Sequence, residues 1–441
     1  MRSSRRRRNL TAWTLIDVRT VIGYGSPNKQ GTSKAHGEPL GAEEVKLTKQ
    51  ALGWQVEEPF FIPGEALEHF REAIDNGAKW EADWQATYDA WKKAYPDLAT
   101  QYELALAGKL PDGWDADLPA LLQPAGSKAA ATRDSNGVAL NAIAKHIPTM
   151  IGGDADLSGS TKTLITGLPL YSSANHTARN LQFGVREHAM GAITNGLVLH
   201  GGIIKPYTAT FMTFSDYMRP PMRLAALMNI APIFIFTHDS IGVGEDGPTH
   251  QPIEQLAALR AIPNLTVLRP ADHNETVAAW KVAMQQTRPT VLVFTRQKLP
   301  VFAPDGVMDG VARGAYIKAE ADGGKPAAII ISTGSEVSLA MAAREELAKQ
   351  GIQVRVVSMP SFELFRNQDQ SYRDQVLPPA IQARVAIEAA VPFGWHEWVG
   401  ANGKIVGLER FGASAPYEVV YEKLGITTTA AVDAVKQLLG K

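Results

Sequence analysis

The sequence contains no cysteine among its 441 residues. This absence excludes disulfide bonds, thiolate nucleophiles and zinc sites built on cysteine. No apolar run is long enough to span a membrane, and no apolar segment follows the basic cluster at residues 1–8, as a secretory signal would require. We therefore expect a cytoplasmic protein without a membrane partner. We interpret the basic cluster as a solvated tail or a consequence of the chosen start codon.

The sequence also has almost no excess of charge, because 44 basic residues face 45 acidic ones and leave a net charge of -1. No overall field then favours nucleic acid or an anionic membrane, so we expect no nucleic-acid partner. Neither a Gly-x-Ser-x-Gly elbow nor a P-loop occurs, which disfavours a serine hydrolase or a P-loop nucleotide site. The composition is 45% hydrophobic and 20% charged, which is ordinary for a globular protein of two or three domains.

From about residue 133 onward, buried-type strand patterns alternate with amphipathic helical patterns. The expected strands are 203–206, 232–237, 265–269, 290–295, 327–333, 354–358, 384–388 and 404–408. The expected helices are 134–145, 187–199, 212–228, 275–286 and 336–349. This alternation predicts an α/β fold with two consecutive domains, at 129–308 and 309–441, each with a mainly parallel sheet.

The first 128 residues have a different pattern. A strand is expected at 15–22, where it ends in a turn cluster rich in glycine, and it stands alone without a partner strand. Residues 41–128 are polar, helical in pattern and punctuated by prolines. We interpret 1–40 as a basic tail with the remnant of another domain, and 41–128 as a long helical linker.

The densest group of polar side chains is the loop at 237–252, which contains two histidines, three acidic residues and three glycines. It begins where the expected strand at 232–237 ends. Ligands of parallel sheets bind beyond the carboxyl ends of strands, so this loop is a candidate site. The alternative is a polar loop that uses its glycines only for turns.

Two further segments carry candidate groups. Glu187 opens an expected helix, where an acidic residue commonly interacts with the helix dipole, and taken alone this structural role is favoured over a catalytic one. Phe211, Phe214 and Tyr217 are spaced to share a helical face, which taken alone favours core packing. The pair Gly334-Ser335 after a strand could bind an anion, but a plain helix cap is favoured there as well.

Taken together, these segments resemble those of transketolases. The loop at 237–252 is similar to the family's strongest signature, and 183–191 resembles the segment that carries its catalytic glutamate. Further similar segments occur at 22–29, 35–40, 152–157 and 333–337. The resemblance extends from about Thr14 to the end of the chain.

The resemblance implies a thiamine diphosphate enzyme of three α/β domains. The first domain holds the diphosphate and a Mg²⁺ or Ca²⁺ ion through a Gly-Asp-Gly motif, and the second domain holds the aminopyrimidine of the cofactor. No Gly-Asp-Gly motif occurs here. We therefore expect most of the first domain to be missing, its metal ligands to lie in that missing part, and no metal ligand in this chain. A homodimer or an association with a diphosphate-binding chain is expected.

The resemblance also assigns roles in cofactor binding. Glu187 corresponds to the glutamate that hydrogen-bonds the pyrimidine ring and so promotes deprotonation of the thiazolium carbon. The aromatic residues expected around the pyrimidine are Phe211, Phe214 and Tyr217. Asp156 and Leu157 correspond to residues that contact the cofactor, although Asp154 stands where a serine is common.

For the substrate, the resemblance assigns His36 and His250 to sugar hydroxyls and proton relay, which makes them catalytic candidates with Glu187. Asp246 is expected to read the stereochemistry of a hydroxyl. The residues expected to bind the terminal phosphate of the sugar are Arg133, Ser160, His238 and Arg296. Two arginines suit a phosphate because their planar donors can fork onto its oxygens.

The expected activity is the transfer of a two-carbon ketol unit from xylulose 5-phosphate to ribose 5-phosphate or erythrose 4-phosphate, in the pentose phosphate pathway or the Calvin cycle. Without a diphosphate-binding domain, the isolated chain is expected to be inactive. The alternatives are a dihydroxyacetone or deoxyxylulose phosphate synthase, a catalytically silent fragment, and a non-catalytic subunit of a split thiamine diphosphate enzyme.

Overall fold

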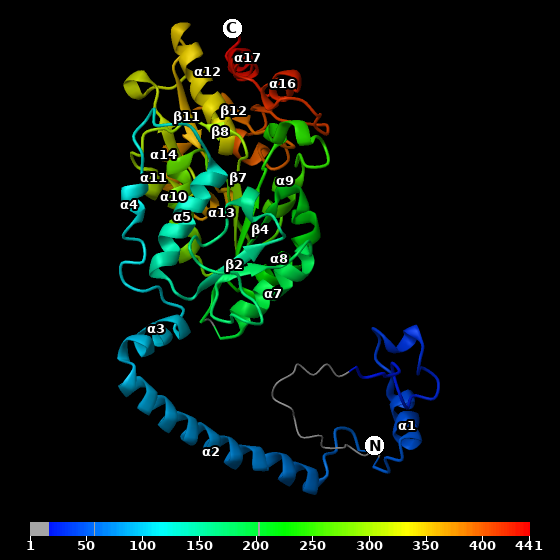
Figure 1. Cartoon of the computed structure of the whole chain (residues 1–441). Helices are drawn as coiled ribbons and strands as arrows, with labels where there is room; N and C mark the ends of the chain where they lie inside the picture. The colour runs from blue at the N-terminus through cyan, green and yellow to red at the C-terminus, as the bar shows by residue number, and fades with distance from the viewer. Residues whose placement is uncertain (1–16, 57, 202) are drawn as a thin grey trace. The chain divides into compact units, whose positions relative to one another are not determined.

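The structure is a computed structural model that describes residues 17–56, 58–201 and 203–441. The chain forms two compact units, Met1–Tyr95 and Pro96–Lys441. In Figure 1 the first unit is blue and the second runs from cyan to red. The basic cluster at 1–8 and the first two residues of the expected strand at 15–22 lie outside the described residues.

The first unit contains η1 (Ser33–Ala35), α1 (Ala42–Ala51) and α2 (Gly64–Ala94). Glu44 on α1 holds the loop before it, because its carboxylate accepts hydrogen bonds from the backbone N–H of Asn28 at 2.8 Å and from the Asn28 side chain at 2.9 Å. The expected strand was wrong for residues 17–22, which are exposed and not in a strand. In the described part of this unit they have no partner strand.

The second unit opens with α3 (Pro96–Leu106) and α4 (Leu118–Leu121). Together with α1 and α2, these helices confirm the helical character expected before residue 128. The domain borders that we predicted at 40, 128 and 308 stay predictions.

A six-stranded parallel sheet follows, with the order β3-β2-β4-β5-β7-β6. Its strands are β2 (Met150–Asp154), β3 (Asn180–Gln182), β4 (Lys205–Phe211), β5 (Ile233–Thr237), β6 (Thr266–Leu268) and β7 (Thr290–Phe294). Its helices are α5 (Thr132–His146), α6 (Ser158–Thr161), α7 (Glu187–Leu199), α8 (Ser215–Met228), α9 (Gln255–Arg260) and α10 (His273–Gln285), with η2 (Met212–Phe214) before α8 and η3 (Ile241–Asp246) after β5.

Both faces of this sheet are buried, as parallel sheets require. Successive residues of a strand point to opposite faces, so Ile233 and Ile235 pack with α5 and α10, whereas Phe234 and Phe236 pack with α7 and α8. Figure 1 shows α5 and α10 on one side of β7 and β4, with α7 and α8 on the other. This arrangement leaves the two ends of the strands as the places where polar loops can form sites.

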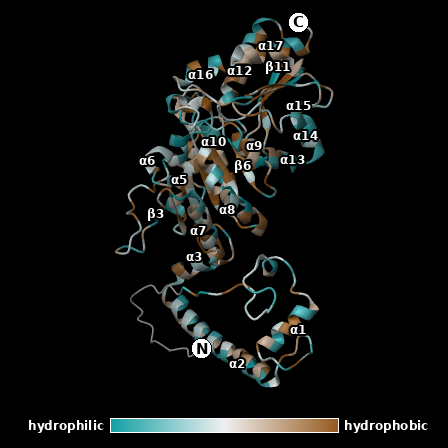
Figure 2. Ribbon diagram, turned by 90° about the vertical axis from the view of Figure 1, so that its right-hand side faces the viewer, coloured by the Kyte–Doolittle hydropathy of each residue, from teal (hydrophilic) through white to brown (hydrophobic). Residues whose placement is uncertain are grey.

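The C-terminal sheet has the order β13-β12-β10-β11-β9, and only β9 in it is antiparallel. Its strands are β9 (Tyr316–Ala319), β10 (Ala328–Ser332), β11 (Val354–Ser358), β12 (Arg384–Ile387) and β13 (Lys404–Val406). Its helices are α11 (Val307–Ala312), α12 (Val337–Lys349), α13 (Phe362–Arg366), α14 (Gln370–Val376), α15 (His396–Val399), α16 (Tyr417–Lys423) and α17 (Thr428–Leu438), and η4 (Asp322–Gly324) and η5 (Gly334–Glu336) precede β10 and α12. A two-stranded pair, β1 (Ala130–Ala131) with β8 (Lys298–Leu299), completes the second unit. In Figure 2 the hydrophobic segments, in brown, gather around strands such as β6 and β11, while hydrophilic teal marks outer turns.

The predicted α/β fold with mainly parallel sheets is confirmed, but some strands were misplaced. The strand predicted at 203–206 begins later, at Lys205, and continues to Phe211. We missed β2 because Gly152 and Gly153 weaken its strand pattern. These glycines are required by close packing, since a Cβ atom at Gly153 would lie 1.8 Å from the backbone oxygen of Leu181.

Arg269, directly after β6, joins the two sheets. Its side chain is fully buried, and its guanidinium donates to Asp239 at 2.8 Å and to Glu336 at 2.5 Å. Its backbone also pairs with the C-terminal domain, through Pro360 and Gly334. Burial opposes the charge, but the nearby carboxylates of Glu336 and Asp239 raise the pKa of Arg269 well above its ordinary value.

A second buried ion pair also connects the six-stranded sheet's helices to the C-terminal domain. Arg260 on α9 donates two hydrogen bonds to Glu388, at 2.9 and 2.8 Å, and Trp395 donates a third at 2.7 Å. Both charged side chains are almost fully buried. Among the described residues, no helix is both long and apolar enough to cross a membrane.

We expect Arg269→Met to lower the free energy of unfolding by about 3–5 kcal/mol, because it leaves the buried carboxylates of Asp239 and Glu336 without their cation. Urea unfolding of the full chain, followed by circular dichroism, measures this change. The matched control is Lys349→Met, which removes an exposed ion pair with Glu346 and should cost at most about 1 kcal/mol. Equal effects of the two substitutions would show that the ion pairs of Arg269 do not stabilise the contact between the two sheets.

Candidate active site

The candidate residues of the second unit gather at the carboxyl-terminal edge of the six-stranded sheet. Phe211 is the last residue of β4, His238 follows β5 directly, and Arg296 lies two residues beyond β7. These strands are neighbours in the sheet, so their ends meet at one edge. This is the location that the sequence predicted for a ligand of a parallel sheet.

Two threonines bring Arg133 to this edge. The backbone N–H of Thr295 donates to the hydroxyl of Thr132 at 2.7 Å, and the backbone N–H of Thr132 donates to the hydroxyl of Thr295 at 3.0 Å. The N–H of Arg133 then donates to the carbonyl of Thr295 at 3.3 Å. The start of α5 is therefore fixed to the end of β7, which places Arg133 near Arg296.

His238 lies between these elements in a left-handed backbone conformation, with φ at 62°. Its ring nitrogens lie 2.8 Å from the hydroxyl of Thr237 and 3.5 Å from the guanidinium of Arg133. Burial, the positive charges of Arg133 and Arg296, and His250 together lower the pKa of His238 to about 3. The imidazole is therefore uncharged at neutral pH and can donate or accept a hydrogen bond without adding positive charge.

The two arginines create a local excess of positive charge. Burial and the charge of Arg296 lower the pKa of Arg133, although Asp134 acts in the opposite direction. The buried Nε of Arg133 has no hydrogen-bond partner within the described residues. Arg296 donates to the carbonyl of Val243 in η3 at 3.2 Å. An anion placed here would satisfy the unused donor and reduce the repulsion between the guanidinium groups.

Ser160 and Asp246 lie on elements next to these residues. Ser160 is half-buried on α6, which contacts α5, β4 and β5. Asp246 is exposed at the end of η3, the same short helix whose Val243 carbonyl binds Arg296. Their elements border the group around His238, and the prediction that both face one ligand stays a prediction.

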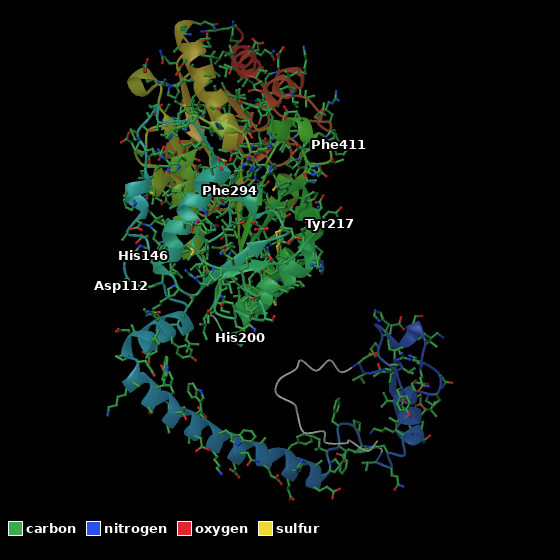
Figure 3. The ribbon with its side chains drawn as sticks, in the orientation of Figure 1. Asp112, His146, His200, Tyr217, Phe294 and Phe411 are labelled. Carbon is green, nitrogen blue, oxygen red and sulfur yellow. The ribbon has the colours of Figure 1, made fainter. Side chains whose placement is uncertain are left out.

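The aromatic side chains form a row that leads from the interior to the surface. The ring centroids of Phe211 and His238 are 3.7 Å apart, those of Phe211 and Phe214 are 6.0 Å apart, and those of Phe214 and Tyr217 are 6.2 Å apart. His250 meets Phe214 edge-on at 5.5 Å. Phe211 is buried, whereas 64% of Tyr217 is exposed, and Figure 3 shows Tyr217 at the margin of the second unit.

This row corrects the expectation of a single helical face. Phe211 ends a strand, Phe214 lies in η2, and Tyr217 lies in the first turn of α8. The rising exposure along the row also differs from simple core packing. The rings form a wall on which a planar ligand could stack.

Glu187 begins α7 as predicted and is buried, with 8% of its surface exposed. Its carboxylate accepts a hydrogen bond at 3.4 Å from Thr210, the residue before Phe211 on β4. The carboxylate therefore lies next to the carboxyl end of β4, where the aromatic row begins. An ionised carboxylate offers roughly four acceptor sites, so this long contact leaves most of its capacity for a ligand.

The turn after β2 is organised by Asp154. Its carboxylate accepts hydrogen bonds from the N–H of Leu157 at 2.6 Å and from the hydroxyl of Thr163 at 3.2 Å, and burial raises the pKa of Asp154. This turn presents Asp156, which is exposed and has a positive φ of 60°. A carboxylate at position 154 thus shapes the turn that carries the two predicted cofactor contacts.

Several residues that build the site were not singled out from the sequence. Thr132, Thr210, Thr237 and Thr295 hold the candidate groups in place, and the signal for three of them is a threonine at the end of an apolar strand. Asp239, counted among the polar residues of the candidate loop, is buried in the ion pair with Arg269. Ser335 accepts from Arg269 at 3.3 Å and donates to Glu336 at 2.6 Å, so it belongs to the buried ion-pair network, and the side-chain cap expected here is not formed by η5 or α12.

His36 belongs to the first unit, where it is exposed immediately after η1. The geometry described above therefore concerns residues of the second unit only. No group of three or more His, Asp or Glu side chains in the described parts of the chain is placed to hold a metal ion.

Comparison with known proteins identifies three family domains in the chain. The model described as "Transketolase, thiamine diphosphate binding domain" matches residues 4–111. "Transketolase, pyrimidine binding domain" matches 128–301, and "Transketolase-like TK C-terminal domain" matches 314–427.

Known relatives agree over almost the whole chain. A transketolase of Geobacillus stearothermophilus is 52% identical over 99% of this chain, which spans 65% of that relative's length. A chloroplastic transketolase of Craterostigma plantagineum is 47% identical over 97% of this chain and 82% of its own length. The crystal structure of a Pichia stipitis transketolase in complex with sedoheptulose 7-phosphate has a TM-score of 0.89 and 38% identity, over 96% of this chain and 62% of that one.

These findings correct the expectation of a truncated first domain. We expected only one strand and the loop around His36 to remain of the diphosphate-binding domain, yet its family model matches residues 4–111. The error arose because this segment is helical and polar and lacks both a Gly-Asp-Gly motif and the strand-helix alternation that marked the other domains. The matches to all three domains, and the identity with relatives of which this chain spans most of the length, place the chain in the transketolase family.

Proposed function

We propose that this protein transfers a two-carbon ketol unit from a ketose phosphate to an aldose phosphate. The donor is xylulose 5-phosphate and the acceptors are ribose 5-phosphate and erythrose 4-phosphate, as in the pentose phosphate pathway and the Calvin cycle. The observation that carries this proposal is the pair of arginines around an uncharged His238, next to an aromatic wall at the end of β4, the strand whose Thr210 contacts the buried Glu187. The sugar phosphate bound to the Pichia stipitis relative supports it.

The residues of the second unit fit the aminopyrimidine of thiamine diphosphate. Phe211, Phe214 and Tyr217 offer aromatic faces for stacking, and Glu187 offers a buried acceptor beside them. Asp156 and Leu157 are the further contacts that we propose. When bound, thiamine diphosphate supplies a carbon nucleophile that carries the two-carbon unit. We assign no residue to the Mg²⁺ or Ca²⁺ ion of the diphosphate, because the described residues form no fitting ligand group.

Each proposed role follows from the chemistry of the side chain. Glu187 accepts a hydrogen bond from the pyrimidine ring and stabilises its protonated form. The phosphate of the sugar is bound by Arg133, Ser160, His238 and Arg296. The guanidinium of Arg133 can only donate, so Nε2 of the uncharged His238 accepts from it and orients it, while Arg133 and Arg296 supply the charge and the donors for the phosphate. His250 and His36 exchange protons with sugar hydroxyls, and Asp246 accepts a hydrogen bond from a hydroxyl of one configuration.

We also propose that the protein forms a homodimer. Large apolar side chains are exposed on the two helices that cover one face of the six-stranded sheet. These are Ile193 and Leu199 on α7, and Leu224 and Leu227 on α8. Burying such a surface against a second copy would remove it from water.

We expect Glu187→Gln to reduce turnover of xylulose 5-phosphate with ribose 5-phosphate by roughly 10²–10⁴-fold, because an amide cannot stabilise a protonated ring nitrogen as a carboxylate does. A coupled steady-state assay of the purified chain with thiamine diphosphate and Mg²⁺ measures this loss. The control is Glu345→Gln, at an exposed position on α12, which should leave turnover unchanged. Turnover of the Glu187 variant within about twofold of the parent would exclude the assigned role, given the scale of such effects.

We expect Arg296→Ala to raise KM for phosphorylated sugars by roughly ten- to a hundredfold, the range for loss of a charge-assisted hydrogen bond, with little change for unphosphorylated ketoses. The matched control is Arg288→Ala, which removes an exposed arginine from the opposite end of β7. Steady-state kinetics with xylulose 5-phosphate and an unphosphorylated ketose separate the two effects. Equal changes for both kinds of substrate would show that Arg296 does not bind the phosphate.

A further inference from the structure

A cavity of about 620 Å³ lies at the amino-terminal ends of β4, β5 and β7. Lys205, the first residue of β4, lines it, whereas Phe211 at the other end of the strand belongs to the candidate active site. At about 3.3 Å per residue, these two positions are roughly 20 Å apart. In Figure 3, Asp112 and His200, which adjoin the cavity-lining segments in the sequence, are labelled at the end of the second unit away from Phe411. The cavity is thus separate from the site described above.

The walls of the cavity are mainly apolar. They include Leu104 on α3, Leu110 and Trp114 after it, Ile204 before β4, and Met284 on α10. The volume lies within the range of roughly 300–1,000 Å³ that is typical of small-molecule pockets. Such walls favour a ligand with an apolar body.

Two lysines line this cavity, of which Lys109 is exposed and Lys205 is the more buried one. Its side chain is half-buried, and within the described residues its ammonium group has no hydrogen-bond acceptor and no acidic partner. Burial lowers the pKa of Lys205 to about 8, so much of the amine is still protonated at neutral pH.

A charge withdrawn from water is costly unless it is paired. A ligand with one negative charge would pair with the ammonium group of Lys205. Lys109, the other lysine of the lining, is exposed, so water solvates its charge and it needs no counter-ion. We propose that this cavity binds an amphipathic organic monoanion, with its carboxylate on Lys205 and its apolar body against Leu104, Trp114 and Met284. This inference does not rest on the proposed enzymatic function.

The experiment uses isothermal titration calorimetry of the full chain with octanoate, and with octanol as the uncharged analogue. Octanoate should bind saturably, and Lys205→Met should weaken it at least tenfold, as expected for loss of a charge-assisted contact, while octanol binding is unchanged. Lys205→Arg, which keeps the charge, should retain octanoate binding. The control Lys325→Met, at an exposed loop position of the C-terminal domain, should behave as the parent.

A second variant tests the cavity without touching the lysine. Ala105→Trp places a large side chain in the cavity and should abolish binding of octanoate and octanol alike. The proposal is overturned if the parent shows no saturable octanoate binding, if Lys205→Met binds octanoate as the parent does, or if Ala105→Trp retains it. Because ketol transfer is not the readout, failure of the proposed function would leave these outcomes unaffected.

Discussion

The arrangement of the second unit depends on the charge of Arg269. A guanidinium removed from water is stable only if carboxylates surround it, and here Asp239 comes from the six-stranded sheet while Glu336 comes from the C-terminal domain. Tyr421 on α16 donates to Glu336 at 2.7 Å and lies 3.2 Å from the hydroxyl of Ser240. The residues on the carboxyl side of His238 are thereby bound to the other domain. The shape of the loop at 237–252 is consequently a property of both domains.

Within the six-stranded sheet, threonines at or near strand ends hold the candidate site residues in place. Thr295 fixes the start of α5, Thr237 contacts the ring of His238, and Thr210 contacts Glu187. Each has its hydroxyl within a residue of a strand's end, where the side chain can hold a functional group. The candidate site is therefore an extension of the sheet, and its geometry follows from the strand register.

Helices and strands with a clear hydrophobic periodicity were predicted from the sequence. Features that depend on long-range packing or on buried charge pairs were not. The apolar run of β5 and the amphipathic pattern of α7 have their own signals, and both were placed within a residue of their observed starts. In β2, Gly152 and Gly153 hide the strand, because the packing of Tyr207 and Leu181 that requires them is not local. Family motifs identified the residues now found around Arg133 and His238, but not the pairing of Asp239 with Arg269. A polar, helical pattern likewise concealed the match of residues 4–111 to the diphosphate-binding domain.

The pKa of His238 is so low that its ring adds no positive charge to the arginine pair near neutral pH. With a pKa of about 3, this imidazole stays uncharged across the physiological range, and guanidinium groups do not lose their proton in proteins. A phosphate monoester, in contrast, loses its second proton near pH 6, as phosphorylated side chains do. If the proposed ester binds between these three side chains, a change of charge there between a mildly acidic and a neutral medium comes from the ester. Under the proposed function, these three side chains keep the same charge, and the ionisation state of a phosphate ester determines how strongly they bind it.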